Sequence, residues 1–292
     1  TNGCANTVAV ARAIEKTMMR RNLGELMSAI VRPATIGSIG FVESAMRAAD
    51  LPQARVAVHN NATRQKMPLL RTRSLTKTVT SGDAPLTILD DVSFDVERGE
   101  TVAIVGASGS GKTTLLGLMA GLDLPTSGDV WLDDAQLSTL DEDARAALRQ
   151  RALGFVFQSF QLLPAMTALE NVMLPLELDS NKDARAIAID WLKRVGLAHR
   201  VTHYPRQLSG GEQQRVAIAR AFASDPMLLL ADEPSGNLDQ ATGGEVADLM
   251  FRLNREHGTT LVLVTHETTL ASRCARRLSL AGGRLVGDER TG

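Results

Sequence analysis

The sequence lacks paired cysteines, long apolar runs and any large excess of charge of one sign. Its 292 residues include two cysteines, Cys4 and Cys274, which excludes a disulfide framework. No run approaches 18 consecutive apolar residues, which argues against a membrane-spanning helix, and the first thirty residues lack the ordered features of a secretory signal. Lys and Arg (32) nearly balance Asp and Glu (33), so a global electrostatic grip on nucleic acid is not expected. These absences predict a cytoplasmic globular protein.

The charge is nevertheless unevenly placed along the chain. Residues 1–66 carry nine Lys and Arg against four Asp and Glu, and short helical patterns occur at 8–27 and 42–49. This segment is read either as a regulatory or membrane-surface arm, or as an extension outside the native protein, whose start would then lie near Met67. We therefore divide the chain into an N-terminal extension of unknown role, residues 1–66, and one domain, residues 67–292.

From Leu69 onward, strand patterns and helix patterns alternate. The expected strands are 74–79, 86–96, 101–105, 227–231 and 260–264, followed by a terminal hairpin around Gly282 and Gly283. The expected helices are 113–122, 141–151, 183–195, 212–224 and 244–257. This order predicts an α/β fold with a mainly parallel core sheet and antiparallel strands at its start.

A glycine-rich turn between the expected strand 101–105 and the expected helix 113–122 matches the pattern G-x-x-x-x-G-K-[ST]. Glycines let successive backbone N–H groups surround phosphate oxygens, and the following helix directs its positive end at the same anion. Lys112 is expected to reach the β- and γ-phosphates, and the Thr113 hydroxyl to ligate Mg²⁺. The sequence therefore predicts a nucleoside triphosphate site formed by Gly106, Ala107, Ser108, Gly109, Ser110, Gly111, Lys112, Thr113 and Thr114.

Two adjacent carboxylates follow the apolar run 227–231. Asp232 and Glu233 at the tip of a buried strand are costly unless they are paired or bind a cation. Beside a phosphate-binding loop, Asp232 is the expected partner of Mg²⁺. Glu233 faces differently and is the candidate for the base that polarises the water attacking the γ-phosphate.

The segment Leu208–Arg215, with the sequence LSGGEQQR, narrows the class of nucleotide-binding protein to which the chain could belong. Ser-Gly-Gly before a helix is a second anion-binding helix start, which serves little purpose for a nucleotide already held by Gly106–Thr113. This second helix start has a function if it contacts the nucleotide bound by another subunit. With this segment the chain resembles the ATP-binding subunits of ABC transporters, of which this sequence is the signature.

The other motifs of that family follow in order, and the resemblance implies their roles. Gln158 would contact Mg²⁺ and the attacking water, Asp239 would lie in a loop that crosses the dimer interface, and His266 would contact the γ-phosphate. Glu233, His266 and Lys112 would form the catalytic set, with Thr113, Gln158 and Asp232 on Mg²⁺. Two subunits would pack head to tail and bury two ATP molecules, each covered by the other subunit's Ser209, Gly210 and Gly211. The implied fold is an ABC-type ATPase with an antiparallel β subdomain and a helical signature subdomain.

Several segments narrow the resemblance further. The stretches 154–160, 163–164, 167–172 and 234–239 are similar to the subgroup that serves lipoprotein release and macrolide export, and most of all to its bacterial YbbA-type subunits. This implies a homodimer on the inner face of the bacterial plasma membrane, driving a separate integral membrane permease with a large periplasmic domain. The alternative is a non-transport ABC ATPase acting on a soluble ribosomal or DNA complex. Such proteins usually carry two ATPase units or a long coiled-coil insertion, which this chain lacks.

One position departs from the family pattern. Family members usually place an aromatic residue before the phosphate-binding loop to stack on adenine, and here the equivalent residue is Val79. An aliphatic side chain loses the stacking contribution of about 0.5–1.5 kcal/mol. The sequence therefore predicts weakened ATP affinity or relaxed base selectivity.

Other residues are read in structural terms. His199 and His203 have the spacing of a metal pair, but no accompanying Glu or Cys supports a site. The apolar stretch Gln161–Leu178 is either helical-subdomain core or a permease-docking surface. Trp191 is expected in the core, and a solvated helix face is expected to carry Arg273, Arg276 and Arg277.

Overall fold

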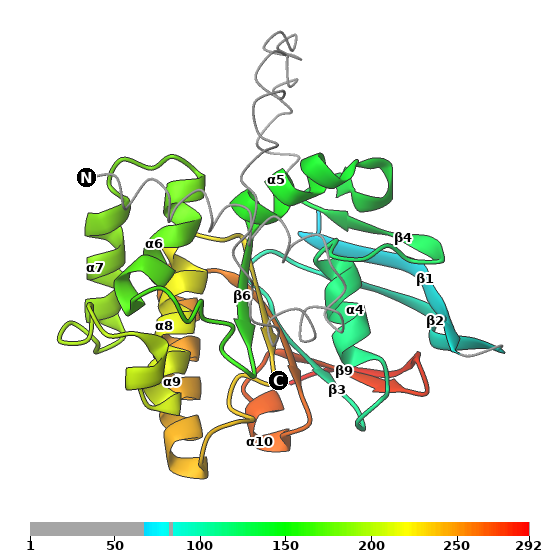
Figure 1. Cartoon of the computed structure of the whole chain (residues 1–292). Coiled ribbons are helices and arrows are strands. Elements are labelled where there is room, and N and C mark those ends of the chain that lie inside the picture. Colours follow the sequence, from blue (N-terminus) through cyan, green and yellow to red (C-terminus); the bar gives the residue numbers. More distant parts are fainter. Residues whose placement is uncertain (1–66, 82–83, 292) are drawn as a thin grey trace, which may run out of the picture.

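Two β-sheets and seven α-helices make up the part of the chain that the structure, a computed structural model, describes: residues 67–81 and 84–291 (Figure 1). The helical patterns expected at 8–27 and 42–49 lie outside these residues. None of the described helices is both long and apolar enough to span a membrane.

The smaller sheet is antiparallel and lies at the start of the domain. Its order is β2-β1-β4-β5, with β1 Leu70–Ser81, β2 Ala84–Val96, β4 Ser127–Leu132 and β5 Ala135–Gln136. β1 and β2 form a long hairpin, in which Leu70 pairs with Val96 and Val79 pairs with Leu86. The strands expected at 74–79 and 86–96 are therefore confirmed, and both extend further than the apolar pattern indicated.

The larger sheet brings the chemistry-bearing motifs to one edge. Its order is β10-β9-β3-β8-β7-β6, with bounds β3 Thr101–Val105, β6 Leu153–Phe157, β7 Leu228–Asp232, β8 Thr260–Thr265, β9 Arg276–Ala281 and β10 Arg284–Arg290. All neighbouring pairs are parallel except β9 with β10. In this register Val105 lies beside Thr265, and Phe157 lies beside Asp232. Because parallel strands end together, the loops after β3, β6, β7 and β8 meet at one carboxyl edge.

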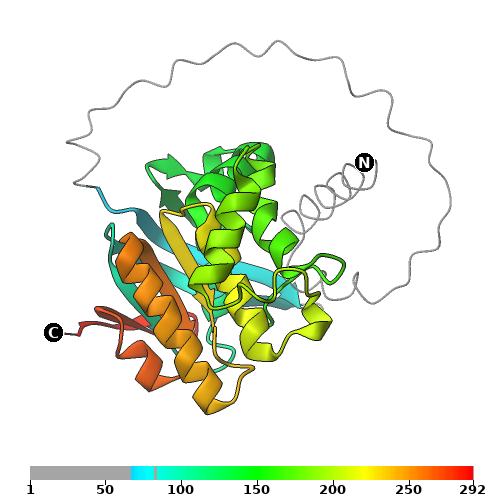
Figure 2. The same ribbon diagram turned by 90° about the vertical axis from the view of Figure 1, so that its left-hand side faces the viewer.

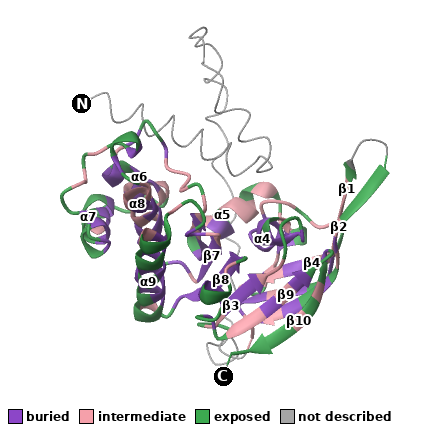
Figure 3. Ribbon diagram, turned by 90° about the horizontal axis from the view of Figure 1, so that it is seen from below, coloured by how far each residue is buried: buried purple, intermediate pink, exposed green. Residues whose placement is uncertain are grey.

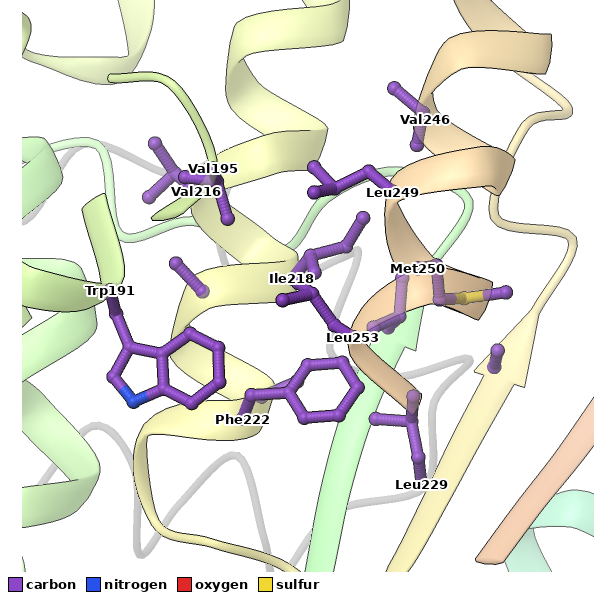
Figure 4. Close-up of a cluster of buried hydrophobic side chains, with 14 of the residues drawn as sticks. Trp191, Val195, Val216, Ile218, Phe222, Leu229, Val246, Leu249, Met250 and Leu253 are labelled. Carbon is purple, nitrogen blue, oxygen red and sulfur yellow. The ribbon is translucent and has the colours of Figure 1, made fainter. Parts of the chain in front are cut away.

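Both faces of the parallel centre of the larger sheet are buried, which explains the unbroken apolar runs of β3, β7 and β8. Along β8, Leu261 and Leu263 join a core on the helical side, whereas Val262 and Val264 join a core on the other side. Figure 3 shows this buried centre in purple. The helical-side core includes Trp191, which confirms the expectation for that residue, and its ring stacks on Phe222 at 5.6 Å between centroids (Figure 4).

The helices divide between the two faces. Helices α6 Ala168–Leu178, α7 Ala184–Arg194, α8 Gly210–Ala223 and α9 Gln240–His257 gather on one side of the sheet, as Figures 1 and 2 show. Helix α4 Lys112–Met119 packs on the opposite face, where its leucines join the other core with β1, β2 and β4. The remaining helices are α5 Glu142–Ala152 and the short α10 Thr268–Ala271, with 3₁₀ turns at Leu137–Thr139 and Pro205–Gln207.

Several elements differ from the sequence-based expectation. Helix α6 was not among the expected helices. The capping box of Thr167 and Glu170 starts it, and it continues through Pro175. Helix α8 begins at Gly210 and not at Glu212, because Ser209 is its N-cap. The expected helix face for Arg276 and Arg277 is wrong. Both lie on strand β9, and Arg276 is largely buried against Asp288.

Candidate nucleotide-hydrolysis site

The phosphate-binding loop joins β3 to α4, as the pattern predicts. Only glycine fits at two of its positions. A Cβ on Gly106 would lie 2.2 Å from the Leu280 carbonyl oxygen, and Gly111 has φ +98° with its Cβ direction blocked at 2.9 Å by the Ile88 carbonyl oxygen. Lys112 is buried, and its Nζ donates to the carbonyl oxygens of Gly106 and Ala107, each at 2.9 Å. The Lys112 side chain thus folds back over the loop that would bind the phosphates.

The acid pair ends strand β7 beside this loop. The Thr113 hydroxyl donates to Asp232 Oδ2 at 3.3 Å, which joins two of the oxygen groups expected on Mg²⁺. Burial raises the pKa of Asp232 above its usual range, and the neighbouring Glu233 adds to the rise. A divalent cation would offset both effects by stabilising the ionised carboxylate, so the oxygen donors and their electrostatics fit Mg²⁺.

Glu233 and His266 meet at the edge of the sheet. Nδ1 of His266 lies 2.9 Å from Glu233 Oε1, although 33 residues separate them, because β7 and β8 are adjacent strands that end together. Glu233 has φ +44°, a left-handed conformation that is strained for a residue with a side chain, and its N–H donates to the Val264 carbonyl. The strained turn directs the carboxylate away from the strand axis and toward the histidine.

The loop after β6 is tied to the loop after β7. Gln158 Nε2 donates to Asn237 Oδ1 at 3.1 Å, and Asn237 Nδ2 donates back to the Gln158 carbonyl at 3.0 Å. Asp239, two residues further on, is the N-cap of α9. The Thr242 hydroxyl and backbone N–H hold the pKa of its carboxyl below its usual range. Gln158 and Asp239 therefore lie on two loops held together by Asn237.

The signature segment starts helix α8 on the helical side. Ser209 is exposed, its hydroxyl accepts from the Glu212 N–H at 3.2 Å, and Glu212 Oε2 accepts from the Ser209 N–H at 2.8 Å. This backbone bond and the Arg200 guanidinium hold the pKa of Glu212 below its usual range. Helices α8 and α4 lie on opposite faces of the sheet, so Ser209 does not join the loop before α4 of its own subunit (Figure 1).

The sequence identified most of the edge but missed the residues that connect it. Asn237, Gln214 and Ser235, which donates to Glu267 Oε1 at 3.0 Å, lie within the recognised segments 208–215 and 234–239, but no role was assigned to these three side chains. Thr114 lies in the first turn of α4, as expected. Among the described residues no three His, Cys, Asp or Glu side chains are grouped so that they could hold a metal ion, and His203 contacts Arg200.

A nucleotide-binding loop and an acid pair at the carboxyl edge of a parallel sheet define a P-loop ATPase fold. The ABC transporter family model matches residues 89–236. The chain is 54% identical over 219 residues to the "Uncharacterized ABC transporter ATP-binding protein YbbA" of Escherichia coli (strain K12), covering 74% of this chain and 96% of that protein. It is 51% identical over 222 residues to the lipoprotein-releasing system ATP-binding protein LolD of Geobacter metallireducens, covering 75% of this chain and 99% of that protein.

Solved structures agree with these sequence relatives. A dimeric post-hydrolysis state of the ATP-binding cassette MJ0796 bound to ADP and Pi superposes with a TM-score of 0.71 at 41% identity, over 76% of this chain and 99% of that chain. The chain belongs to the ABC transporter family as an ATP-binding subunit. It is an ATPase with an ABC-type fold, as the resemblance implied.

Proposed function

We propose that two copies of this subunit pack head to tail around two ATP molecules and drive a separate membrane permease with a large periplasmic domain. The observation that carries this proposal is the separation of the signature from the phosphate-binding loop across the sheet. An exposed, glycine-flanked helix start that lies away from its own nucleotide loop needs a second subunit's nucleotide to act on. The relative LolD is a lipoprotein-releasing system ATP-binding protein, which supports lipoprotein release here, and export or mechanotransmission is the related alternative.

The residue roles in this proposal come from the motifs and the family resemblance, and the geometry of the edge supports them. Backbone N–H groups of Gly106–Thr114 would surround the phosphates, and Lys112 would exchange its two carbonyl acceptors for phosphate oxygens. Glu233 would take the proton from the attacking water, with His266 beside it stabilising charge at the γ-phosphate. Thr113, Asp232 and Gln158 would hold Mg²⁺, which neutralises charge on the phosphates.

Across the dimer interface, Ser209, Gly210 and Gly211 would cover the partner's ATP, and Asp239 would lie at the interface. Such a subunit would lie peripherally on the inner face of the bacterial plasma membrane. We also propose that residues 67–292 form the ATPase domain and that 1–66 is an extension of unknown role. The matched length of 219 residues supports that division.

The dimer is tested with the Glu233→Gln variant. It should bind ATP and elute as a dimer in size-exclusion chromatography with ATP and Mg²⁺, while hydrolysis falls by about 10²-fold or more. Glu256→Gln, an exposed carboxylate on α9, is the matched control and should turn over normally. Normal turnover of Glu233→Gln would refute the role of base, and a monomer with ATP bound would refute the dimer.

The partner is tested with the same variant, which holds the ATP-bound state. A pull-down from the native membrane in mild detergent should recover one integral membrane protein in stoichiometric amount. Its periplasmic part would then indicate the cargo. Recovery of ribosomal or DNA-associated proteins without a membrane partner would favour the non-transport alternative.

A further inference from the structure

The side chain of Gln214 links the signature helix to both loops that carry the hydrolytic residues. Gln214 lies one turn after Gly210 on α8 and is fully buried. Its Nε2 donates to the Pro234 carbonyl oxygen at 2.7 Å and to the Phe157 carbonyl oxygen at 3.3 Å. These carbonyls adjoin Glu233 and Gln158, so one amide group fastens the ends of β6 and β7 to α8.

The two loops that Gln214 holds contain strained backbone. Glu233 has φ +44°, and Phe160 and Gln161 after the other strand have φ +61° and +49°. Such conformations persist only where neighbouring groups hold them. Gln214 holds the turn at Pro234. Arg220, two turns further along α8, donates to the Phe160 and Gln161 carbonyls at 3.1 and 2.6 Å. The signature helix therefore holds the backbone of both hydrolytic loops.

The same helix start packs tightly against the loop after β7 and against the first turn of α9. A Cβ on Gly210 would lie 3.1 Å from Leu238 Cδ2, and one on Gly211 would lie 2.4 Å from Thr242 Cγ2. Gln214 Oε1, meanwhile, has no hydrogen-bond partner among the described residues. A buried acceptor left without a partner costs stability, so the amide is poorly explained by folding stability alone.

We propose that Gln214 is a positioning residue that couples the two ATP sites of the dimer. The proposal rests on the head-to-tail dimer described above. When the start of α8 seats on the partner's ATP, the helix shifts as a body, and Gln214 carries that shift to the turns of Glu233 and Gln158 in its own subunit. Occupation of one site thereby sets the geometry of the water-activating carboxylate in the other.

The test compares the unsubstituted full-length protein with the Gln214→Met variant, which keeps the side-chain length and removes the hydrogen-bond donor. ATPase rate is measured against ATP concentration, and ADP affinity is measured separately at a protein concentration at which the subunit is monomeric. Gln214→Met should lower kcat about tenfold and bring the Hill coefficient from above 1 to about 1, while ADP affinity stays within about twofold. The phosphate-binding loop is untouched, so the loss should fall on kcat.

Two further variants separate positioning from loss of stability. Asn254→Leu removes another buried amide, which donates to the Thr259 carbonyl at the far end of α9, and should lower stability while leaving cooperativity intact. Gln214→Glu keeps the shape, and its protonated carboxyl can donate to the Pro234 carbonyl. The activity of Gln214→Glu relative to the unsubstituted protein should therefore rise as the pH is lowered.

The outcomes distinguish this inference from the dimer on which it rests. Cooperative hydrolysis by the full chain together with unchanged cooperativity in Gln214→Met would overturn the coupling role and leave the dimer standing. Equal loss of cooperativity in Asn254→Leu would also overturn it, because general destabilisation would then be the cause. If the full chain itself hydrolyses ATP without cooperativity and Glu233→Gln stays monomeric with ATP, the dimer fails and the coupling role falls with it.

Discussion

Gly211 carries two constraints that one pair of variants can separate. In the proposed dimer it covers the partner's ATP, but within its own subunit a Cβ at this position would lie 2.4 Å from Thr242 Cγ2. Carbon atoms at optimal separation lie about 3.5–4.0 Å apart, so Gly211→Ala forces Thr242 or the helix start to move by more than about 1 Å. The clash arises in the monomer and needs no nucleotide.

The expected size of the effect follows from that clash. Overpacking of this kind costs about 1–3 kcal/mol, and replacing a helical glycine by alanine returns up to about 1 kcal/mol. Gly211→Ala should therefore lower the free energy of unfolding by about 1–2 kcal/mol, which corresponds to a Tm lower by about 2–8 °C in a domain of this size. Thr242→Ser removes Cγ2 and keeps the hydroxyl that Asp239 uses.

The assay is urea unfolding of the four proteins in this cycle, with ATPase activity measured in parallel. Thr242→Ser should restore the stability of Gly211→Ala, giving a coupling energy of about 1–2 kcal/mol. ATPase activity should stay low in the double variant, because the added methyl group still meets the partner's nucleotide. Absence of coupling would refute the packing argument. Restoration of activity together with stability would show that Gly211 serves packing alone.

Three further predictions concern other parts of the site. Asn171→Leu removes the acceptor of the Leu163 N–H at 2.8 Å in a buried loop, so stability should fall by about 2–4 kcal/mol in calorimetry while ATP affinity is retained. Asp232→Asn should raise the Tm of the nucleotide-free protein at pH 7, because the raised pKa of Asp232 marks a charge that destabilises the fold above that pKa. The gain should vanish as the pH falls toward 3.8, and a gain that persists there contradicts its electrostatic origin. Val79→Tyr should tighten ATP binding by about twofold to tenfold in titrations. Unchanged affinity would show that Val79 does not deprive the site of a stacking contribution to adenine binding.

Strands β3, β7 and β8 of the nucleotide edge were predictable because their patterns are local. A buried parallel strand reads as an apolar run, and the chemistry follows directly where that run stops, as at Asp232 after residues 227–231. The parallel register then brings the ends together without further information. Family resemblance assigned roles to Gln158 and His266 that their positions alone do not give, and those roles stay predictions.

The connections between loops were not predictable from the sequence, because they depend on tertiary packing. Gln158 and Asn237 are 79 residues apart, and either amide alone is typical of an exposed loop. Strand β6 was missed. Its Gly154 is explained by packing against α8, because a Cβ there would lie 2.5 Å from the Ala221 carbonyl oxygen. Helix α6 was also missed, although it carries a local signal, Thr167 with Glu170 three residues later, and it continues through an internal Pro175.

The glycines of the motifs show that one position can require glycine for two separate reasons, the approach of a nucleotide and packing within the subunit. The phosphate-binding and signature patterns attribute glycine to the approach of a nucleotide, yet Gly106 and Gly211 are also closed off by atoms of their own subunit. Gly236 likewise faces Gln158, whose Nε2 would lie 2.8 Å from an added Cβ. A variant at any of these positions perturbs packing and ligand contact together. Loss of activity after such a substitution therefore identifies a nucleotide contact only when trimming the neighbouring side chain restores the fold and leaves the activity lost.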